Sequence, residues 1–315
     1  MKICLSIAKM DAEFSKMIDA LQPYAQVDVV GLTGFSLEGY DIFIGKRLSA
    51  QALDTADRLK IAFAYKTGVD DFPLKKMQKM GIILVNSHVD ANIIAEYTFG
   101  LSISLVNRIT ECDKKLRHGI WYDNTNPYWE SIFDMKVGLL GYGHIGKHIH
   151  KLLQKNGIQT LTLNRGKDYE DIVAVDTLEE LFQKADIVIL SLPKTPETNN
   201  IINADTIKFL RGKYIVNVGR SNCIDQKALF EALRDNLLAG AAIDTWDEKP
   251  KDRHTKLFPS SDYSFQDLDN IVLSPHQATR INVGHQRYVG DICQKVIRYI
   301  TSGEITDRVD LARGY

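Results

Sequence analysis

Residues 136–155 decide the fold: they read KVGLLGYGHIGKHIHKLLQK, a β-rich run followed by a glycine-rich turn and a helix-like stretch. The turn, Gly141-Tyr142-Gly143-His144-Ile145-Gly146, has the spacing G-x-G-x-x-G. Gly141 permits a tight bend, Gly143 lets the backbone approach a pyrophosphate, and Gly146 lets helix and strand pack closely. Amide groups at the helix start, including those of His144 and Ile145, would bind the anion. This context predicts dinucleotide binding; the alternative is a glycine-rich turn without a ligand.

The next β-rich run, residues 159–164, bears on which dinucleotide is bound. NAD-binding units place an acidic residue at the end of this strand, where it binds the ribose hydroxyls. Here Asn164 and Arg165 stand at that point, and the first carboxylate, Asp168, comes later in the loop. Because Arg165 is a cation that would attract a 2′-phosphate, we expect NADP or the use of both cofactors. The alternative is that Arg165 stacks on adenine and NAD is preferred.

Outside this segment, short β-rich runs alternate with amphipathic stretches. The runs before it are 3–8, 27–32, 41–45, 60–65 and 82–87, and those after it are 159–164, 186–192, 214–219, 238–244 and 270–275. Strands separated by helices indicate parallel βαβ units, and runs that are nearly continuous in apolar character indicate sheets covered on both faces. We therefore expect two α/β units, the second of which binds the dinucleotide.

Composition narrows the class of protein further. The 315 residues suffice for two ordinary domains, and a net charge of -1 gives no electrostatic reason to expect nucleic acid or an anionic membrane as partner. No apolar run approaches the roughly 18 residues of a membrane span, and the N-terminal segment does not resemble a signal peptide. We expect a cytoplasmic protein.

The four cysteines, Cys4, Cys112, Cys223 and Cys293, lie far apart. They have neither the Cys-x-x-Cys nor the Cys/His spacing of a metal site, so we expect reduced thiols and no metal. We do not expect Cys223 to be a catalytic thiol, because no histidine pattern accompanies it.

Further motifs follow one another along the chain: YKTGVD at 65–70, the Ala-Glu pair at 95–96, LPKTPET at 192–198, VNVGRS at 216–221, AID at 242–244 and SPH at 274–276. With the glycine turn, they resemble the D-isomer-specific 2-hydroxyacid dehydrogenases nearly from end to end. That family contains the glycerate, phosphoglycerate, glyoxylate/hydroxypyruvate and D-lactate dehydrogenases. The resemblance implies two Rossmann-like or flavodoxin-like domains with parallel sheets. A cofactor domain at 101–284 would be inserted into a substrate domain at 1–100 and 285–315.

The resemblance also implies roles for individual residues. The backbone amides of Thr67 and Gly68 would hold the substrate carboxylate, Arg220 would bind that carboxylate and the keto oxygen, and His276 would be the acid/base. The implied cofactor contacts outside the glycine turn are Asn164, Arg165, Leu192, Pro193, Thr198, Val218, Gly219, Asp244 and His276. Asp244 would meet the nicotinamide carboxamide. Homodimers are common among such relatives.

The residue types suit the reduction of a small 2-keto acid to a 2-hydroxy acid. Negative charge develops on the keto oxygen as hydride arrives, and a bidentate cation such as Arg220 can stabilise it. A histidine such as His276 can supply the proton, because imidazole titrates near neutral pH. The alternatives are a structural salt bridge for Arg220 and a merely exposed loop position for His276.

The third catalytic group is open. The family places a Glu before a Pro, five residues after the Asp matched by Asp244, and this Glu orients the His. Lys249 occupies that position and Glu248 lies one residue earlier. A backbone adjustment could bring Glu248 onto His276, the position could hold Lys249 or be vacant, or Asp247 could serve. Without Glu248 on His276 we expect an acid-shifted optimum.

Two other functions remain possible: a non-enzymatic NAD(P)-sensing corepressor, and a dehydrogenase of the same fold acting on another small acid such as formate. The presence of both Arg220 and His276 argues against the sensor.

His148 and His150 are expected at the surface of the helix that follows the glycine turn. Trp121, Tyr122 and Trp129 either line a substrate pocket or pack in the core or a dimer.

Overall fold

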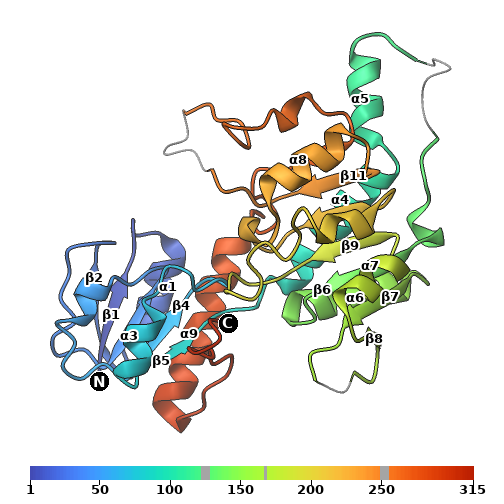
Figure 1. The fold of residues 1–315 in the computed structure, drawn as a ribbon. Coiled ribbons are helices and arrows are strands. Elements are labelled where there is room, and N and C mark those ends of the chain that lie inside the picture. The colour runs from blue at the N-terminus through green and yellow to red at the C-terminus, as the bar shows by residue number, and fades with distance from the viewer. Residues whose placement is uncertain (122–127, 167–168, 249–254) are drawn as a thin grey trace. The chain divides into compact units, whose positions relative to one another are not determined.

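The computed structural model describes residues 1–121, 128–166, 169–248 and 255–315, and the chain divides into two compact units (Figure 1). The first unit comprises Met1–Asp90 and Arg280–Tyr315, and the second comprises Ala91–Thr279. Each unit is built on a parallel sheet with helices packed against it. The predicted α/β fold class is confirmed.

The first unit has a five-stranded sheet in the order β2-β1-β3-β4-β5. Its strands are β1 (Lys2–Ser6), β2 (Gln26–Val30), β3 (Ile42–Gly45), β4 (Ile61–Ala64) and β5 (Ile83–Val85), and its helices are α1 (Ala12–Leu21), α2 (Ala50–Leu53), α3 (Leu74–Lys79) and α9 (Gly284–Ser302). Strands β3 and β4 are buried throughout, as their unbroken apolar runs predict. Helices α1 and α9 share one hydrophobic core over the sheet, so the C-terminal helix completes a unit that the N-terminal residues begin.

The second unit has a seven-stranded sheet in the order β12-β11-β10-β9-β6-β7-β8. Its strands are β6 (Lys136–Leu140), β7 (Gln159–Leu163), β8 (Val173–Val175), β9 (Ile187–Leu190), β10 (Tyr214–Asn217), β11 (Gly240–Ile243) and β12 (Ile271–Leu273). Its helices are α4 (Ala91–Val106), α5 (Ile109–Arg117), α6 (His144–Lys155), α7 (Leu178–Lys184) and α8 (Gln226–Arg234). The chain proceeds in one direction from β6 to β8 and in the other from β9 to β12. The topological switch point, where α/β sheets bind ligands, is therefore between β6 and β9.

Every β-rich run predicted from the sequence contains a strand, whereas β8 was not anticipated. The unit boundaries fall after Asp90 and before Arg280 rather than at residues 100 and 285. Helix α4 is the reason for the first shift: Ile94, Leu101 and Leu105 are buried in the same core as the strands of the second sheet. All of α4 thus packs with the second unit.

Residues 91–117 form two helices, α4 and α5, rather than one continuous helix. Arg108 adopts a left-handed backbone, with φ of 55°, between α4 and α5, and its Nε donates to Glu111 Oε2 at 2.7 Å. Helix α5 buries none of its residues. Within the described ranges, no helix has both the length and the apolar character needed to cross a bilayer.

Candidate functional site

The glycine turn joins β6 to α6, and each glycine meets a different steric demand. Gly141 has φ of +105°, and a Cβ there would lie 3.0 Å from the Ser191 carbonyl oxygen. A Cβ on Gly146 would lie 2.0 Å from the Gly141 carbonyl oxygen, inside any allowed contact. Gly143 caps α6 and has open space where a Cβ would point. The turn is closed on its protein side and open at Gly143, as a pyrophosphate site requires.

The end of β9 and the end of β10 are packed just as tightly beside this turn. Ser191 Oγ donates to the Gly141 carbonyl oxygen at 3.1 Å. A Cβ on Gly219 would lie 2.7 Å from both the backbone N and O of Leu192, so only glycine fits there. Thr198 Oγ1 donates to the Pro193 carbonyl oxygen at 2.7 Å. Val218 bonds through its amide to the Leu190 carbonyl oxygen at 3.0 Å. The predicted cofactor residues of these two connections therefore share one edge of the sheet with the glycine turn.

At the end of β7, the side chain of Asn164 shapes the loop. Its Oδ1 accepts from the Gly166 amide at 2.9 Å, and its Nδ2 donates to Asp176 Oδ1 at 3.3 Å. Arg165 is exposed, and Asp168 lies outside the described residues. Asp176 follows β8, and β8 pairs with β7. A carboxylate is thus present near the end of β7 after all, but it comes from the neighbouring strand, which sequence spacing could not reveal.

Arg220 lies in the connection between β10 and α8 and is half-buried. The loop is held by the buried Asn217, whose Oδ1 accepts from the Gly219 amide at 3.0 Å and whose Nδ2 donates to the Arg220 carbonyl oxygen at 3.0 Å. Cys223, three residues on, is fully buried, and burial raises the pKa of its thiol. A thiol kept protonated and out of contact with solvent is inert, which agrees with the expectation that Cys223 is not a nucleophile.

His276 lies after β12 in a left-handed backbone conformation, with φ of 56°. Such a conformation is uncommon for a residue other than glycine, and surrounding bonds must hold it. Asp244, which is 1% exposed, supplies them: Oδ1 accepts from the Gln277 amide at 2.7 Å and Oδ2 from the Ala278 amide at 3.2 Å. The carboxylate expected to meet the nicotinamide therefore also fixes the backbone on the C-terminal side of His276.

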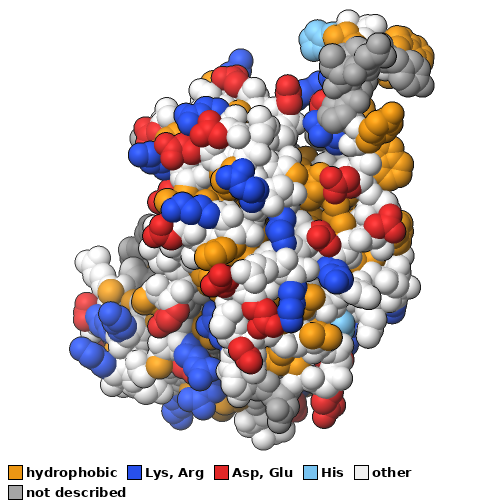
Figure 2. Space-filling view, turned by 45° about the vertical axis from the view of Figure 1, so that its right-hand side comes forward, with side chains coloured by type: hydrophobic (Ala, Val, Ile, Leu, Met, Phe, Trp, Pro, Cys, Tyr) orange, Lys and Arg blue, Asp and Glu red, His pale blue; other side chains and the backbone are white. Residues whose placement is uncertain are grey.

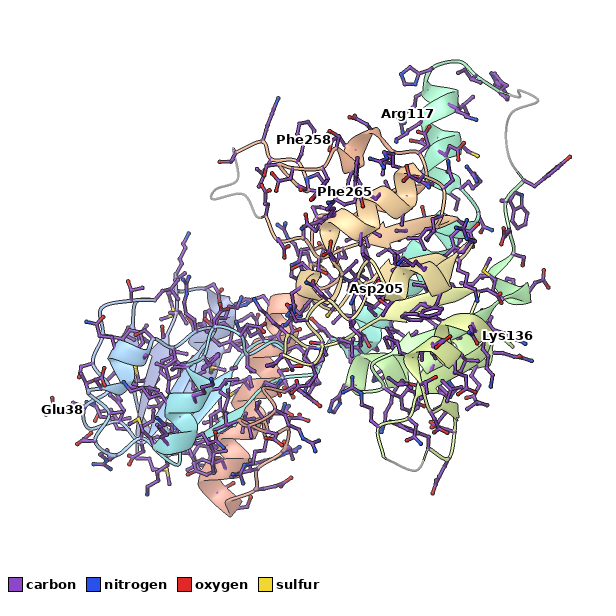
Figure 3. All side chains as sticks on the ribbon, viewed as in Figure 1. Glu38, Arg117, Lys136, Asp205, Phe258 and Phe265 are labelled. Carbon is purple, nitrogen blue, oxygen red and sulfur yellow. The ribbon has the colours of Figure 1, made fainter. Side chains whose placement is uncertain are left out.

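The residues before His276 are held as well. Ser274 Oγ donates to Asp244 Oδ1 and lies 2.8 Å from the Tyr97 hydroxyl on α4. Trp246 Nε1 donates to the Ser274 carbonyl oxygen at 3.0 Å. Trp246 in turn packs on Phe265, with ring centroids 5.3 Å apart; Phe265 is labelled in Figure 3. An exposed histidine thus stands on a rigidly held backbone.

Glu248 is placed on Ser261 rather than on His276. Its Oε1 accepts from the Ser261 amide at 2.7 Å and from the Ser261 hydroxyl at 2.6 Å, and these bonds lower its pKa. Asp247 Oδ2 accepts from Gln226 Nε2 at 2.9 Å. Glu248 takes this position because Ser261 lies beside it and offers two donors, an amide and a hydroxyl, to its carboxylate. Lys249 lies outside the described residues.

In the first unit, Thr67 and Gly68 follow β4 as the sequence predicts, and Thr67 is held on three sides. Its Oγ1 donates to the Ser87 carbonyl oxygen at 2.9 Å, its carbonyl oxygen accepts from Asn86 Nδ2 at 2.7 Å, and Tyr288 Oη lies 3.1 Å from its Oγ1. Among the described residues, no acceptor takes the amide hydrogen of Thr67 or of Gly68. Two adjacent amides are left to bind an anion, and Tyr288 is a contact that sequence reasoning missed.

Two predictions about single side chains need correction or restriction. His150 is not at the surface: it is buried, and its Nδ1 lies 2.6 Å from Thr160 Oγ1. The signal was in the sequence, because Gly146, Ile149 and Leu153 share a helical face with position 150. Trp121 and Trp129 are exposed rather than packed in this chain's core, and Tyr122 lies outside the described residues.

Comparisons with known proteins agree with this geometry. Residues 99–278 match the family described as D-isomer specific 2-hydroxyacid dehydrogenase, NAD binding domain. A glyoxylate reductase of Thermofilum pendens is 30% identical over 269 residues, covering 82% of this chain and 77% of the relative. A D-3-phosphoglycerate dehydrogenase of Methanocaldococcus jannaschii is 28% identical over 307 residues, and the match spans 93% of this chain but only 56% of that relative.

A solved structure of a protein from Pyrococcus horikoshii is 31% identical, with a TM-score of 0.83 over 98% of this chain and 95% of the other. The family match covers the whole sheet that carries the glycine turn, and the structural match extends over both units. The protein belongs to the D-isomer-specific 2-hydroxyacid dehydrogenases and is an NAD(P)-dependent enzyme of that family.

Proposed function

We propose that the protein reduces a small 2-keto acid to the corresponding 2-hydroxy acid, with Arg220 binding the carboxylate and the keto oxygen and His276 supplying the proton. The observation that carries this proposal is the held backbone at His276, since its left-handed conformation is fixed by Asp244 through the Gln277 and Ala278 amides. Strain of this kind is retained where a side chain must point in one direction.

Within this proposal, the nicotinamide cofactor supplies the hydride when bound, and the protein supplies charge, position and a proton. Arg220 presents a planar cation to the oxygen that gains charge, which lowers the barrier. His276 donates its proton to that same oxygen, and the reverse reaction returns it. The free amides of Thr67 and Gly68 hold the substrate carboxylate. Glu248, bound to Ser261, holds its own loop and takes no part in proton transfer.

The experiment that tests the proposal is a substrate panel with both reduced cofactors. Glyoxylate is the first acid to test, because one relative is a glyoxylate reductase and another, a D-3-phosphoglycerate dehydrogenase, also acts on a small acid. We expect oxidation of the cofactor with at least one 2-keto acid and none with ketones that lack the carboxylate. Tight cofactor binding without oxidation by any acid would favour a cofactor sensor instead.

For the cofactor itself, we propose a preference for NADP. Arg165 is exposed beside the end of β7. The pKa of Glu197 is lowered mainly by a hydrogen bond with Thr195 and by its own backbone amide, and to a smaller extent by the charge of Arg165. A 2′-phosphate would find a ready cation there. Asp176, held by Asn164, acts in the opposite direction, so NADH remains a substrate.

Replacing Arg165 with serine is expected to raise the Kd for NADPH about tenfold and to leave that for NADH nearly unchanged, because one charge-assisted bond is lost. Fluorescence titration with each cofactor measures both values. Arg211→Ser is the matched control, since Arg211 is exposed and precedes β10 at the opposite edge of the sheet. Equal weakening of both cofactors in Arg165→Ser would assign Arg165 to adenine stacking and contradict the NADP preference.

We also propose that two copies of the chain form a dimer through α5 and the exposed apolar residues near it at 120–121 and 128–133. Figure 2 shows hydrophobic side chains gathered around the projecting end of the second unit, and Arg117 marks the end of α5 in Figure 3. The exposed apolar residues of this region are Ile109, Leu116, Ile120, Trp121, Tyr128, Trp129 and Phe133. An accumulation of exposed large apolar side chains marks a protein interface.

Leu116→Glu is expected to convert the dimer into a monomer, because a carboxylate would be buried in an apolar contact. Light scattering on wild-type protein should give twice the 35.6 kDa of one chain, and on the variant the mass of one chain. Lys114→Ala, on the same helix but polar, should remain dimeric. A wild-type mass of one chain would refute the proposed dimer.

A further inference from the structure

A buried lysine on the C-terminal helix joins three segments of the first unit. Lys295 of α9 is 8% exposed, which is rare for a lysine unless its charge is paired. Its Nζ donates to the Asn86 carbonyl oxygen at 3.0 Å and lies 2.7 Å from both Asp291 Oδ2 and Asp307 Oδ2. Because an ammonium group has three N–H donors, each of them has an acceptor. The acceptors belong to the connection after β5, to α9 itself and to the segment after α9.

The connection after β5 receives further bonds from the same two acids. Ser87 Oγ donates to Asp291 Oδ2 at 2.6 Å, and the Asn86 amide donates to the Asp307 carbonyl oxygen at 3.3 Å. Asp307 has a left-handed backbone, with φ of 53°, so its own position depends on such contacts. Asn86 and Ser87 are therefore held to α9 and to the C-terminal segment by both side-chain and backbone groups.

The remaining groups of these two residues hold the connection after β4. Asn86 Nδ2 donates to the Thr67 carbonyl oxygen at 2.7 Å, and the Ser87 carbonyl oxygen accepts from Thr67 Oγ1 at 2.9 Å. The Ser87 amide donates to the Lys66 carbonyl oxygen at 3.1 Å. The position of Thr67 is thus set by two residues whose own position is set by Lys295.

We propose that Lys295 is a positioning residue for the substrate carboxylate. This inference rests on the proposed function, in which the Thr67 and Gly68 amides bind that carboxylate. Without the ammonium group, two carboxylates would lie close together with no counter-charge, and the Asn86 carbonyl oxygen would lose its donor. The connection after β4 would then lose its support, and the two amides would no longer point at one anion. A misplacement of about 1 Å can weaken a reaction by up to about a hundredfold.

The test is the KM for a reduced 2-keto acid, compared with kcat, in Lys295→Met. We expect KM to rise about tenfold and kcat to fall by less than about twofold, because the carboxylate contact weakens and the reacting groups stay in place. A loss of folded enzyme alone would lower kcat and leave KM unchanged. Arg298→Met is the control, since Arg298 is exposed on the same helix, and it should keep the wild-type KM.

A double variant, Asp291→Leu with Lys295→Met, separates positioning from stability. It should unfold at a higher urea concentration than Lys295→Met, because replacing both partners of a buried ion pair costs less than removing one. Its KM should stay raised, because Asn86 and Ser87 still lack their partners. A KM that returned to the wild-type value together with stability would overturn the inference, as would an unchanged KM in Lys295→Met.

Calorimetric titration of oxamate, an unreactive analogue of a 2-keto acid, into enzyme holding NADPH separates this inference from the proposed function. We expect its Kd to rise about tenfold in Lys295→Met. If wild-type enzyme binds oxamate but reduces no 2-keto acid, that rise would support the inference although the proposed reduction had failed. An unchanged Kd would overturn the inference alone, and a failure of wild-type enzyme to bind oxamate would overturn both.

Discussion

His276→Ala is expected to lower kcat/KM for keto-acid reduction by about 10²- to 10⁴-fold, the usual effect of removing a positioned proton donor. Hydride transfer without a proton leaves a charge on the oxygen that Arg220 alone must stabilise. The Kd for NADPH should change little, because most of the proposed cofactor contacts lie in the glycine turn and in the connections after β9 and β10. Steady-state kinetics and cofactor titration on the same preparation measure the two effects separately.

The control for this prediction is Glu248→Gln. Because the Glu248 carboxylate accepts both of its bonds from Ser261, the variant should keep the pH profile of the wild-type enzyme. A profile shifted to acid in Glu248→Gln would show that Glu248 reaches His276 during catalysis. Activity in His276→Ala close to that of the wild type would remove His276 from the mechanism.

The second large effect is expected from Gly146→Ala. The new Cβ would lie 2.0 Å from the Gly141 carbonyl oxygen, and since that atom is backbone, the turn itself must move. We expect a loss of about 2–4 kcal/mol in the free energy of unfolding. We also expect at least a hundredfold rise in the Kd for NADPH, because the amides proposed to bind the pyrophosphate would shift with the turn. Urea unfolding and cofactor titration measure these quantities.

Gly100→Ala is the matched control. Gly100 lies inside α4, and a Cβ there would meet nothing within 4 Å. Alanine favours a helix interior over glycine, so this variant should gain about 0.5–1 kcal/mol of stability and bind NADPH as the wild type does. If Gly146→Ala behaved like Gly100→Ala, the steric account of the glycine turn would be wrong.

Sequence reasoning succeeded where the signal is local. The glycine turn could be predicted from six residues, because the G-x-G-x-x-G spacing between a β-rich run and a helix-like stretch is itself the signal. The burial of His150 could also be predicted, because its position lies on the apolar face of α6. The prediction failed because it rested on the polar character of histidine and not on that position. Most strands could be predicted because their runs are nearly continuous in apolar character.

What the sequence could not supply depends on pairing between distant segments. Asp176 comes near the end of β7 only because β8, three residues long, pairs with β7. Glu248 faces Ser261 because the chain folds back there, and no spacing rule predicts that contact. Arg108 ends α4 without a glycine or proline, so the break between α4 and α5 had no local marker. Tyr288 reaches Thr67 from a helix more than two hundred positions away along the chain.

The most direct test of the central claim is the chirality and amount of product formed by the wild-type enzyme. A 2-keto acid that gives a chiral product, such as hydroxypyruvate or pyruvate, is mixed with NADPH, and the 2-hydroxy acid is resolved by chiral chromatography. The account predicts one D-2-hydroxy acid formed for each NADPH oxidised, and loss of both in His276→Ala. NADPH bound as tightly as by the family's enzymes but left unoxidised by every 2-keto acid would contradict it.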